Sequence, residues 1–253
     1  MIFPIGDTQV IGGYKPYFSY VFIALNIFVF FLQLVTPGNL VCEWATIPHD
    51  ILHGNSLYTL IASMFLHSGY MHIAGNLIFL WVFADNIEAT IGNFNFLIFY
   101  LSGGIIASLA HIYIGGGLEQ SVGCCIPCRD VMNGCKEGIK VCPEHIPSLG
   151  ASGAISAVLG AYLIMFPSSR IKILFLVIFR TFYLSAWVFL GIWFLQQLIA
   201  GLIPVAAMAS LGIDGVAWWA HIGGFVFGIF CGYFFKRKFI FDKVVSRAYN
   251  QIE

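Results

Sequence analysis

Residues 216–235 read VAWWAHIGGFVFGIFCGYFF, an apolar run without any Asp, Glu, Lys or Arg. A helix of this length rises about 30 Å, which is the thickness of the hydrocarbon core of a bilayer. Within the run, His221, Gly224, Gly228 and Gly232 recur at steps of three or four residues and share one helix face. Small residues in such a row let a second helix pack closely, so this stretch predicts a transmembrane helix with a close partner.

Five further apolar runs lie upstream, so the sequence predicts an all-α fold, a polytopic membrane bundle of six transmembrane helices. Residues 57–66 are too short to span and are expected to form an interfacial or re-entrant helix. Residues 171–179 are also short and are expected to belong to a cytoplasmic connection. The six predicted spans cover residues 18–35, 70–90, 94–114, 150–167, 182–205 and 216–235.

The composition agrees with a membrane protein. Hydrophobic residues make up 59% of the chain, charged residues only 9%, and the mean hydropathy is +0.88. A soluble globular domain carries about 25% charged residues. The formal net charge is zero, so the chain lacks the basic surface on which electrostatic binding of nucleic acid depends. These values exclude a soluble enzyme, a disordered chain and a nucleic-acid binder, and they leave a protein surrounded by lipid.

The distribution of Lys and Arg predicts the orientation. With six spans both ends of the chain lie on one side, and nine of the twelve Lys and Arg residues fall on that side. The positive-inside rule makes that side the cytoplasm. We expect a cytoplasmic segment at residues 1–17, a membrane domain at 18–235 and a cytoplasmic tail at 236–253, in a protein of the cell membrane. The polar residues within 85–88 are expected to form an interfacial turn.

Four polar side chains lie at a similar depth in the predicted spans. His72 and Asn76 are near the start of the second span, Ser152 near the start of the fourth and His221 near the start of the sixth. All three of these spans run from the outside inward in the predicted topology. Polar groups are costly within a membrane, so each of them is a candidate for function.

The fourth span carries its own row of small residues, Ser152, Ser156 and Gly160. Packing this row against the glycines of residues 216–235 would bring Ser152 and His221 together near the outer ends of the two spans. A serine beside a histidine is the minimal nucleophile–base pair, because the histidine takes the hydroxyl proton as the oxygen attacks a carbonyl. No Asp is placed to orient His221, so these residues favour a dyad over a triad.

Asn76 and His72 are four residues apart, share a helix face and can both donate to a developing oxyanion. Backbone N–H groups at the start of the helix that Ser152 opens are further donors. Each residue also has a plainer explanation. Ser152 could be a packing residue and His221 a packed or ligand-binding histidine, and Asn76 and His72 could form polar contacts between helices. Their convergence at one depth favours a catalytic site.

At these residues the sequence resembles the rhomboid family of intramembrane serine proteases. The resemblance implies a six-helix bundle in which Ser152 is the nucleophile, His221 is the general base, and Asn76 and His72 help to bind the oxyanion. It also implies single-span membrane proteins as substrates and no metal or organic cofactor. The matching stretches are MFLHSGYMHIAGN at 64–76, GASGA at 150–154 and AHIGG at 220–224.

Some positions depart from familiar patterns of this family. Several members have an aromatic residue four positions after the nucleophile, where it stacks on the base, and this chain has Ser156 there. The Trp-Arg pair often found in the first outer loop is replaced by Tyr58 and Thr59. His67 matches the first histidine of the family's second span and is expected to be structural.

The outer loop at residues 115–149 is unusual because it is rich in Gly, Cys and Pro. Three chemical states are open for its cysteines. The pairs Cys-x-x-Cys and Cys-x-x-His within the loop would suit a Cys3His zinc site. Disulfides are permitted on the outer side, although an odd number of cysteines leaves one thiol over, and free thiols are the third state. The residues concerned are Cys124, Cys125, Cys128, Cys135, Cys142 and His145.

Two other functions compete with an intramembrane protease. The first is a catalytically inactive relative that only binds membrane clients, since residue identity does not prove activity. The second is a metal-handling membrane transporter that uses the Cys/His loop together with His67 and His72. A transporter is expected to show internal repeats and a polar site at the midplane, and the sequence shows neither.

Overall fold

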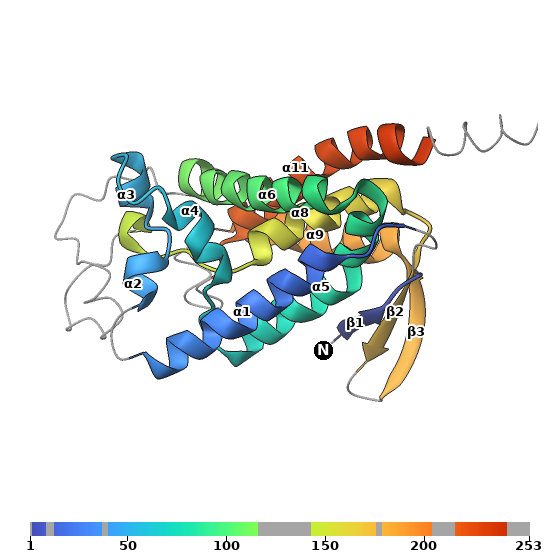
Figure 1. Ribbon diagram of the computed structural model, residues 1–253, viewed down its shortest axis with the longest axis horizontal. Helices are drawn as coiled ribbons and strands as arrows, with labels where there is room; N and C mark the ends of the chain where they lie inside the picture. Colours follow the sequence, from blue (N-terminus) through green and yellow to red (C-terminus); the bar gives the residue numbers. More distant parts are fainter. Residues whose placement is uncertain are drawn as a thin grey trace, which may run out of the picture.

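The computed structural model describes residues 2–8, 13–36, 40–115, 143–175, 179–203 and 216–241. Long helices form the body of the molecule, with short helices at one end and a small sheet at the other (Figure 1). In chain order the elements are β1 (Ile2–Gly6), α1 (Tyr17–Val35), α2 (Leu40–Trp44), α3 (Pro48–Leu52), α4 (Thr59–Ala62), the 3-10 turn η1 (Ser63–Phe65), α5 (Tyr70–Ile91), α6 (Asn93–Ile114), the 3-10 turn η2 (Pro143–His145), α8 (Ser152–Met165), β2 (Arg170–Phe175), β3 (Arg180–Ser185), α9 (Ala186–Leu202), α11 (Trp218–Phe235) and the π-helical η3 (Lys236–Phe241).

The six long helices α1, α5, α6, α8, α9 and α11 match the six predicted apolar runs in position. The main difference is that α9 begins at Ala186 rather than at residue 182, because residues 182–185 belong to β3. The short run at 57–66 is helical only in α4 and η1.

The helices differ in whether they could cross a bilayer alone. Within the described residues, three are long and apolar enough: α1, α6 and α11 with its extension to Phe239. Large apolar side chains such as Phe28, Ile98 and Phe230 are exposed on these three helices, where lipid would cover them. The helices α8 and α9 are apolar but shorter. The predicted helical membrane fold is confirmed, and the count of six spans stays a prediction.

Helix α8 is the centre of the bundle. It contacts α5, α6, α9 and α11, and all of its residues from Gly153 to Tyr162 are buried. A helix that is apolar on every side belongs in a core. Its 14 residues rise about 21 Å, against about 33 Å for the 22-residue α5 and α6. Ser152, its first residue, is therefore held inside the bundle by longer neighbours.

The glycine row of α11 packs directly on the backbone of α8, as the spacing of these glycines predicts. A Cβ added at Gly228 would lie 2.0 Å from a carbonyl oxygen of α8, so only glycine permits this approach. The expected partner row, Ser152–Ser156–Gly160, does face α11, since a Cβ added at Gly160 would lie 2.1 Å from Phe225 O. The closest contacts of the α11 glycines themselves, however, fall on the row of α8 residues one position further along. The facing residues are Gly224 with Gly153, Gly228 with Ala157 and Gly232 with Ala161.

The sheet was not predicted from the sequence. β2 and β3 form an antiparallel hairpin that covers the expected connection at 171–179 and the first residues of the predicted span 182–205, and β1 pairs antiparallel with β2. Ile171 and Ile173 are fully buried and attach the hairpin to the helical core. The N-terminal segment and the connection after α8 thus meet at one end of the molecule, as expected if four spans separate them.

The interfacial turn expected at residues 85–88 is wrong, because α5 continues through these positions to Ile91. Glu88 is fully buried and its carboxylate accepts hydrogen bonds from the first turn of α1. The donors are the N–H of Phe18 at 2.8 Å and the N–H and hydroxyl of Ser19 at 2.7 Å each. A carboxylate at a helix N-terminus satisfies free N–H groups and matches the helix dipole.

A second polar contact ties the N-terminal segment to the core. Asp7, which follows β1, accepts hydrogen bonds from Asn86 Nδ2 at 2.5 Å and from the hydroxyl of Tyr162. Asn86 lies on α5 and Tyr162 on α8. The segment before α1 therefore fixes the ends of two core helices, opposite to the end where α8 begins.

Candidate active site

Ser152 and His221 lie within hydrogen-bond distance. Ser152 is the first residue of α8 and His221 is in the first turn of α11. The distance from Ser152 Oγ to His221 Nε2 is 2.8 Å, and both residues are half-buried. The close approach of the two helices along the glycine row produces this contact, as the sequence spacing predicts.

His221 has a second polar partner, which was not among the residues predicted from the sequence. Its Nδ1 lies 2.8 Å from Oε1 of Gln197 on α9, and Gln197 is 3% exposed. In the sequence, this partner is indicated by the Gln196-Gln197 pair within an otherwise apolar run. A polar residue inside a span is a candidate for function on the same grounds as His221 itself.

His72 is held in one tautomer by its neighbours. The backbone N–H of Ser68 donates to His72 Nδ1 at 3.3 Å, and the Ser68 hydroxyl lies 3.0 Å from the same nitrogen. Because Nδ1 accepts, the ring proton of neutral His72 is on Nε2. This nitrogen points toward the segment before α8, since a Cβ added at Gly150 would lie 2.8 Å from it. Gly150 has a φ of 120°, which favours glycine on backbone grounds as well.

Asn76 presents a donor without an acceptor. Its Nδ2 is buried and has no hydrogen-bond partner among the described residues. It lies 3.8 Å from the position that a Cβ at Gly150 would occupy, on the same side as His72. The first backbone hydrogen bond of α8 runs from the N–H of Ile155 to Ala151 O. The N–H groups of Ser152 to Ala154 come before this bond, in the first turn of the helix. The two side-chain donors therefore lie beside Gly150, two residues before the serine.

Ser156 stands where several family members have an aromatic residue that stacks on the base, and other side chains pack against His221 here. Ser156 donates its hydroxyl to the carbonyl of Ser152 at 2.7 Å and does not reach the imidazole. Trp193 on α9 lies with its ring centroid 6.0 Å from that of His221 and tilted by 35°. Trp218 meets the same ring edge-on at 6.2 Å. Two tryptophans thus flank the imidazole, Trp193 from α9 and Trp218 from the first turn of α11 itself.

Beside Ser152 there is a small cavity with a volume of about 20 Å³, room for about one water molecule. Polar lining comes from Ser63, Ser108 and Ser148, which lie in three separate segments. Such a cavity admits a water molecule next to the hydroxyl, and a peptide segment would need further opening.

The segment that leads into Ser152 is anchored by backbone hydrogen bonds. Thr46 and Ser148 exchange two of them, at 3.0 and 2.8 Å, and the N–H of Gly150 donates to Ser63 O at 2.9 Å. Tyr58, at the position of the family's tryptophan, donates its hydroxyl to Glu43 O at 2.8 Å. The segment between α1 and α5 is therefore fixed without a Trp-Arg pair.

His67 is buried at the start of the segment that leads into α5. Its backbone is clamped by the Gln33 side chain, which accepts from His67 N–H at 2.9 Å and donates to His67 O at 3.1 Å. Its ring packs against Phe30 and His72. Burial, followed by the neighbouring His72, lowers the pKa of His67 from 6.5 to about 4, so this ring stays neutral.

The cysteine cluster of residues 115–149, Cys124 to Cys142, lies outside the described residues. Cys42 on α2 is disulfide-bonded, and Cys231 is a free thiol. His145, the proposed zinc ligand, stacks on His49 with ring centroids 4.6 Å apart. The described residues contain no group of three side chains arranged to hold a metal ion.

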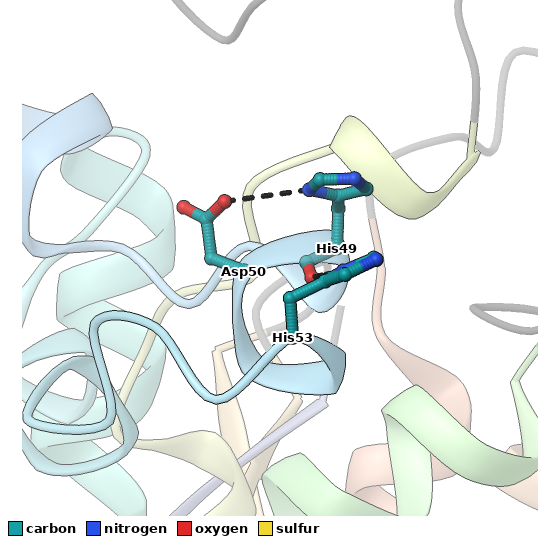
Figure 2. Close-up of polar contacts among 3 residues, drawn as sticks. All are labelled: His49, Asp50 and His53. Atoms are coloured by element: carbon teal, nitrogen blue, oxygen red, sulfur yellow. Dashed lines mark hydrogen bonds and ion pairs between the residues drawn. The ribbon is translucent and has the colours of Figure 1, made fainter.

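His49 belongs to a histidine cluster on the short helix α3. His49 Nδ1 lies 3.5 Å from Asp50 Oδ1. Figure 2 shows this contact, with His53 one turn further along the chain. His53 donates from Nδ1 to the His49 carbonyl at 2.7 Å, and the two rings lie 4.3 Å apart. With His145, these rings join α3 to η2, the turn that precedes the catalytic candidate Ser152.

Comparisons with known proteins identify the family of the chain. A profile of the Rhomboid domain matches residues 54–238. The chain is 29% identical over 168 residues to Rhomboid protease GluP of Bacillus subtilis, which covers 65% of this chain and 27% of that protein. It is 31% identical over 170 residues to the human Presenilin-associated rhomboid-like protein, mitochondrial, with 67% and 36% covered.

Rhomboid protein 1, mitochondrial, of Saccharomyces cerevisiae is 25% identical over 219 residues, with 86% of this chain and 53% of that protein covered. The chain thus spans about a quarter to a half of the length of the curated relatives it matches. Because the domain profile covers most of the chain, including both Ser152 and His221, the protein belongs to the rhomboid family.

Proposed function

We propose that this protein is an intramembrane serine endopeptidase that hydrolyses peptide bonds in or near transmembrane segments of membrane proteins. The observation that carries the proposal is the 2.8 Å contact between Ser152 Oγ and His221 Nε2. A serine that served only for packing would need no imidazole at its hydroxyl. The buried Asn76 amide, without an acceptor among the described residues, adds a donor suited to an oxyanion.

In this mechanism Ser152 Oγ attacks the carbonyl carbon of the scissile peptide bond and its proton passes to His221 Nε2. The carbonyl oxygen becomes an oxyanion, which accepts hydrogen bonds from Asn76 Nδ2 and from the Nε2–H of His72. His221 then gives its proton to the leaving amine as the C–N bond breaks. Water, deprotonated by the same imidazole, hydrolyses the resulting ester and restores the Ser152 hydroxyl.

The proposed substrates are single-span membrane proteins, which reach the site from the surrounding bilayer. We propose that the protein lies in the cell membrane with both termini in the cytoplasm. The excess of Lys and Arg on that side supports this orientation. The sheet supports it too, since it places the N-terminal strand at the same end as Arg170, Lys172 and Arg180.

The test is cleavage of a panel of single-span reporter proteins in lipid vesicles by the purified wild type, Ser152→Ala and a matched control, Ser102→Ala. Ser102 is a half-buried helical serine whose hydroxyl, within the part of the chain that the structure describes, bonds to a carbonyl of its own helix, so its variant should retain activity. Cleavage by wild type and control but not by Ser152→Ala is the expected result. Equal cleavage by all three would reject Ser152 as the nucleophile.

If none of the three cleaves a reporter, labelling with a serine-directed phosphonate probe decides between an unmet substrate preference and an inactive, client-binding relative. Covalent labelling of the wild type that is absent in Ser152→Ala shows an activated serine. Absence of labelling in the wild type would contradict the proposed function.

A further inference from the structure

Gln197 is buried next to the proposed catalytic pair and makes two hydrogen bonds with its amide. It lies on α9 at 3% exposure. Its Nε2 donates to the carbonyl of Trp193, one turn earlier, at 3.2 Å, and its Oε1 lies 2.8 Å from His221 Nδ1. A buried amide with both ends engaged has one orientation.

The polarity of this chain of hydrogen bonds follows from the Trp193 carbonyl. A carbonyl oxygen only accepts, so the NH₂ group of Gln197 must face it and Oε1 must face His221. Oε1 also only accepts, so His221 Nδ1 must carry the proton. His221 Nε2 is then left with its lone pair directed at Ser152 Oγ, 2.8 Å away.

The tautomer matters for the chemistry. A neutral imidazole carries its proton on either nitrogen, and the hydrogen bond made by one nitrogen selects which. With the proton on Nε2, the ring would present a donor to Ser152 and could not take its proton. With the proton on Nδ1, His221 is ready to act as a base.

We propose that Gln197 is a positioning residue that holds His221 in the Nδ1–H tautomer, so that the site works as a Ser152–His221–Gln197 triad. This rests on the proposed function. The amide takes the place that a carboxylate has in soluble serine proteases. A neutral acceptor suits a membrane interior, where an ionised side chain is expensive, and it orients the ring without a buried charge.

A purely structural role gives different expectations. If Gln197 only joined α9 to α11, its loss would lower thermal stability and leave the His221 tautomer and kcat of the folded protein unchanged. If Gln197 positions the base, its loss acts on kcat and leaves KM unchanged, because the serine loses its base and substrate binding is unaffected.

The test uses Gln197→Met, Gln197→Glu and the matched control Gln196→Met, each assayed in lipid on a reporter that the wild type cleaves. Gln196 is the exposed neighbour on the same helix. Methionine keeps the size of Gln197 but removes the acceptor, and we expect kcat to fall about tenfold, as the loss of one hydrogen bond implies. Glutamate keeps an acceptor, so it should retain more activity than methionine.

Gln197→Glu should also move the acidic limb of the pH–rate profile toward higher pH, because a carboxylate stabilises the protonated imidazole. The other titratable groups that act on His221 are His72 on α5 and His111 on α6, and both are unchanged in these variants. A merely structural glutamine would not produce this shift. Equal kcat in wild type and folded Gln197→Met, or an unmoved limb in Gln197→Glu, would overturn the proposal.

Nitrogen-15 NMR of histidine-labelled protein in lipid reads the tautomer directly, whether or not a substrate is known. The His221 signals are identified by their loss in His221→Asn. We expect protonated Nδ1 and unprotonated Nε2 in the wild type and in Gln196→Met, and mixed tautomers in Gln197→Met. A wild type protonated on Nε2 would refute the positioning role, while Ser152→Ala cleavage and probe labelling judge the proposed function separately.

Discussion

The substitution Gly228→Ala tests whether the α8–α11 contact sets the catalytic geometry. The added Cβ would lie 2.0 Å from Ala157 O, whereas ordinary contact begins at 3.4 Å, so the two backbones must separate locally by about 1.4 Å. If α11 shifted by only half of this along the Ser152–His221 line, the 2.8 Å distance would grow to about 3.5 Å. A hydrogen bond of that length is largely lost.

We expect this variant to lose on the order of 100-fold in kcat, since a displacement of about 1 Å costs that much in an aligned site. Overpacking should also lower the free energy of unfolding by about 1–3 kcal/mol. Both are measured in the same lipid preparation, kcat by reporter cleavage and stability by thermal unfolding.

The matched control is Gly191→Ala on α9, where an added Cβ has nothing within 4 Å. The same chemical change there should leave kcat unaltered and stabilise the helix by up to about 1 kcal/mol. If Gly228→Ala behaved like Gly191→Ala in both measurements, close backbone packing would not be what places His221, and the explanation of the site would fail.

Three further substitutions follow from the contacts. Glu88→Gln replaces an acceptor by an NH₂ group facing the donors of α1, so thermal unfolding should show a loss of about 1–3 kcal/mol, and an unchanged midpoint would contradict the capping role. Tyr162→Phe removes the hydroxyl bonded to Asp7 and should cost about 1 kcal/mol with kcat kept, since the contact lies at the far end of α8; a large fall in kcat would show coupling. Gly150→Ala places a Cβ 2.8 Å from the His72 ring at a φ of 120° and should lower kcat in the reporter assay, while labelling by the phosphonate probe should still depend on Ser152. Full activity of this variant would show that the segment adapts.

The contact between α8 and α11 could be predicted because it depends on spacing alone. Glycines four residues apart fix which face of α11 is flat, and His221 shares that face. The facing row on α8 was harder to predict, because Ser156 and Ala157 are both small. The structure selects Ala157, and burial of the whole of α8 explains why small residues occur on more than one of its faces.

The sheet and the Glu88 contact could not be predicted in the same way. β1 pairs with residues about 170 positions later, and the carboxylate of Glu88 reaches an N-terminus some 70 residues earlier in the chain. A charged residue near the end of an apolar run is typical of a membrane boundary, which made a turn at residues 85–88 the simpler interpretation. Burial of Glu88 becomes favourable only once the first turn of α1 supplies its donors.

Gln197 lies between these two cases. Residues 182–205 run from inside to outside in the predicted topology, so Gln196 and Gln197 fall in the outer half of that span, nine and eight residues from its end. Position within an apolar span alone marks this polar pair as candidates for function. It does not say which of the two faces inward, because neighbouring residues on a helix point about 100° apart. The packing of α9 against α11 decides this, burying Gln197 against the imidazole and leaving Gln196 exposed. Comparing Gln197→Met with Gln196→Met therefore tests the contact between Gln197 and His221, which only the three-dimensional arrangement supplies.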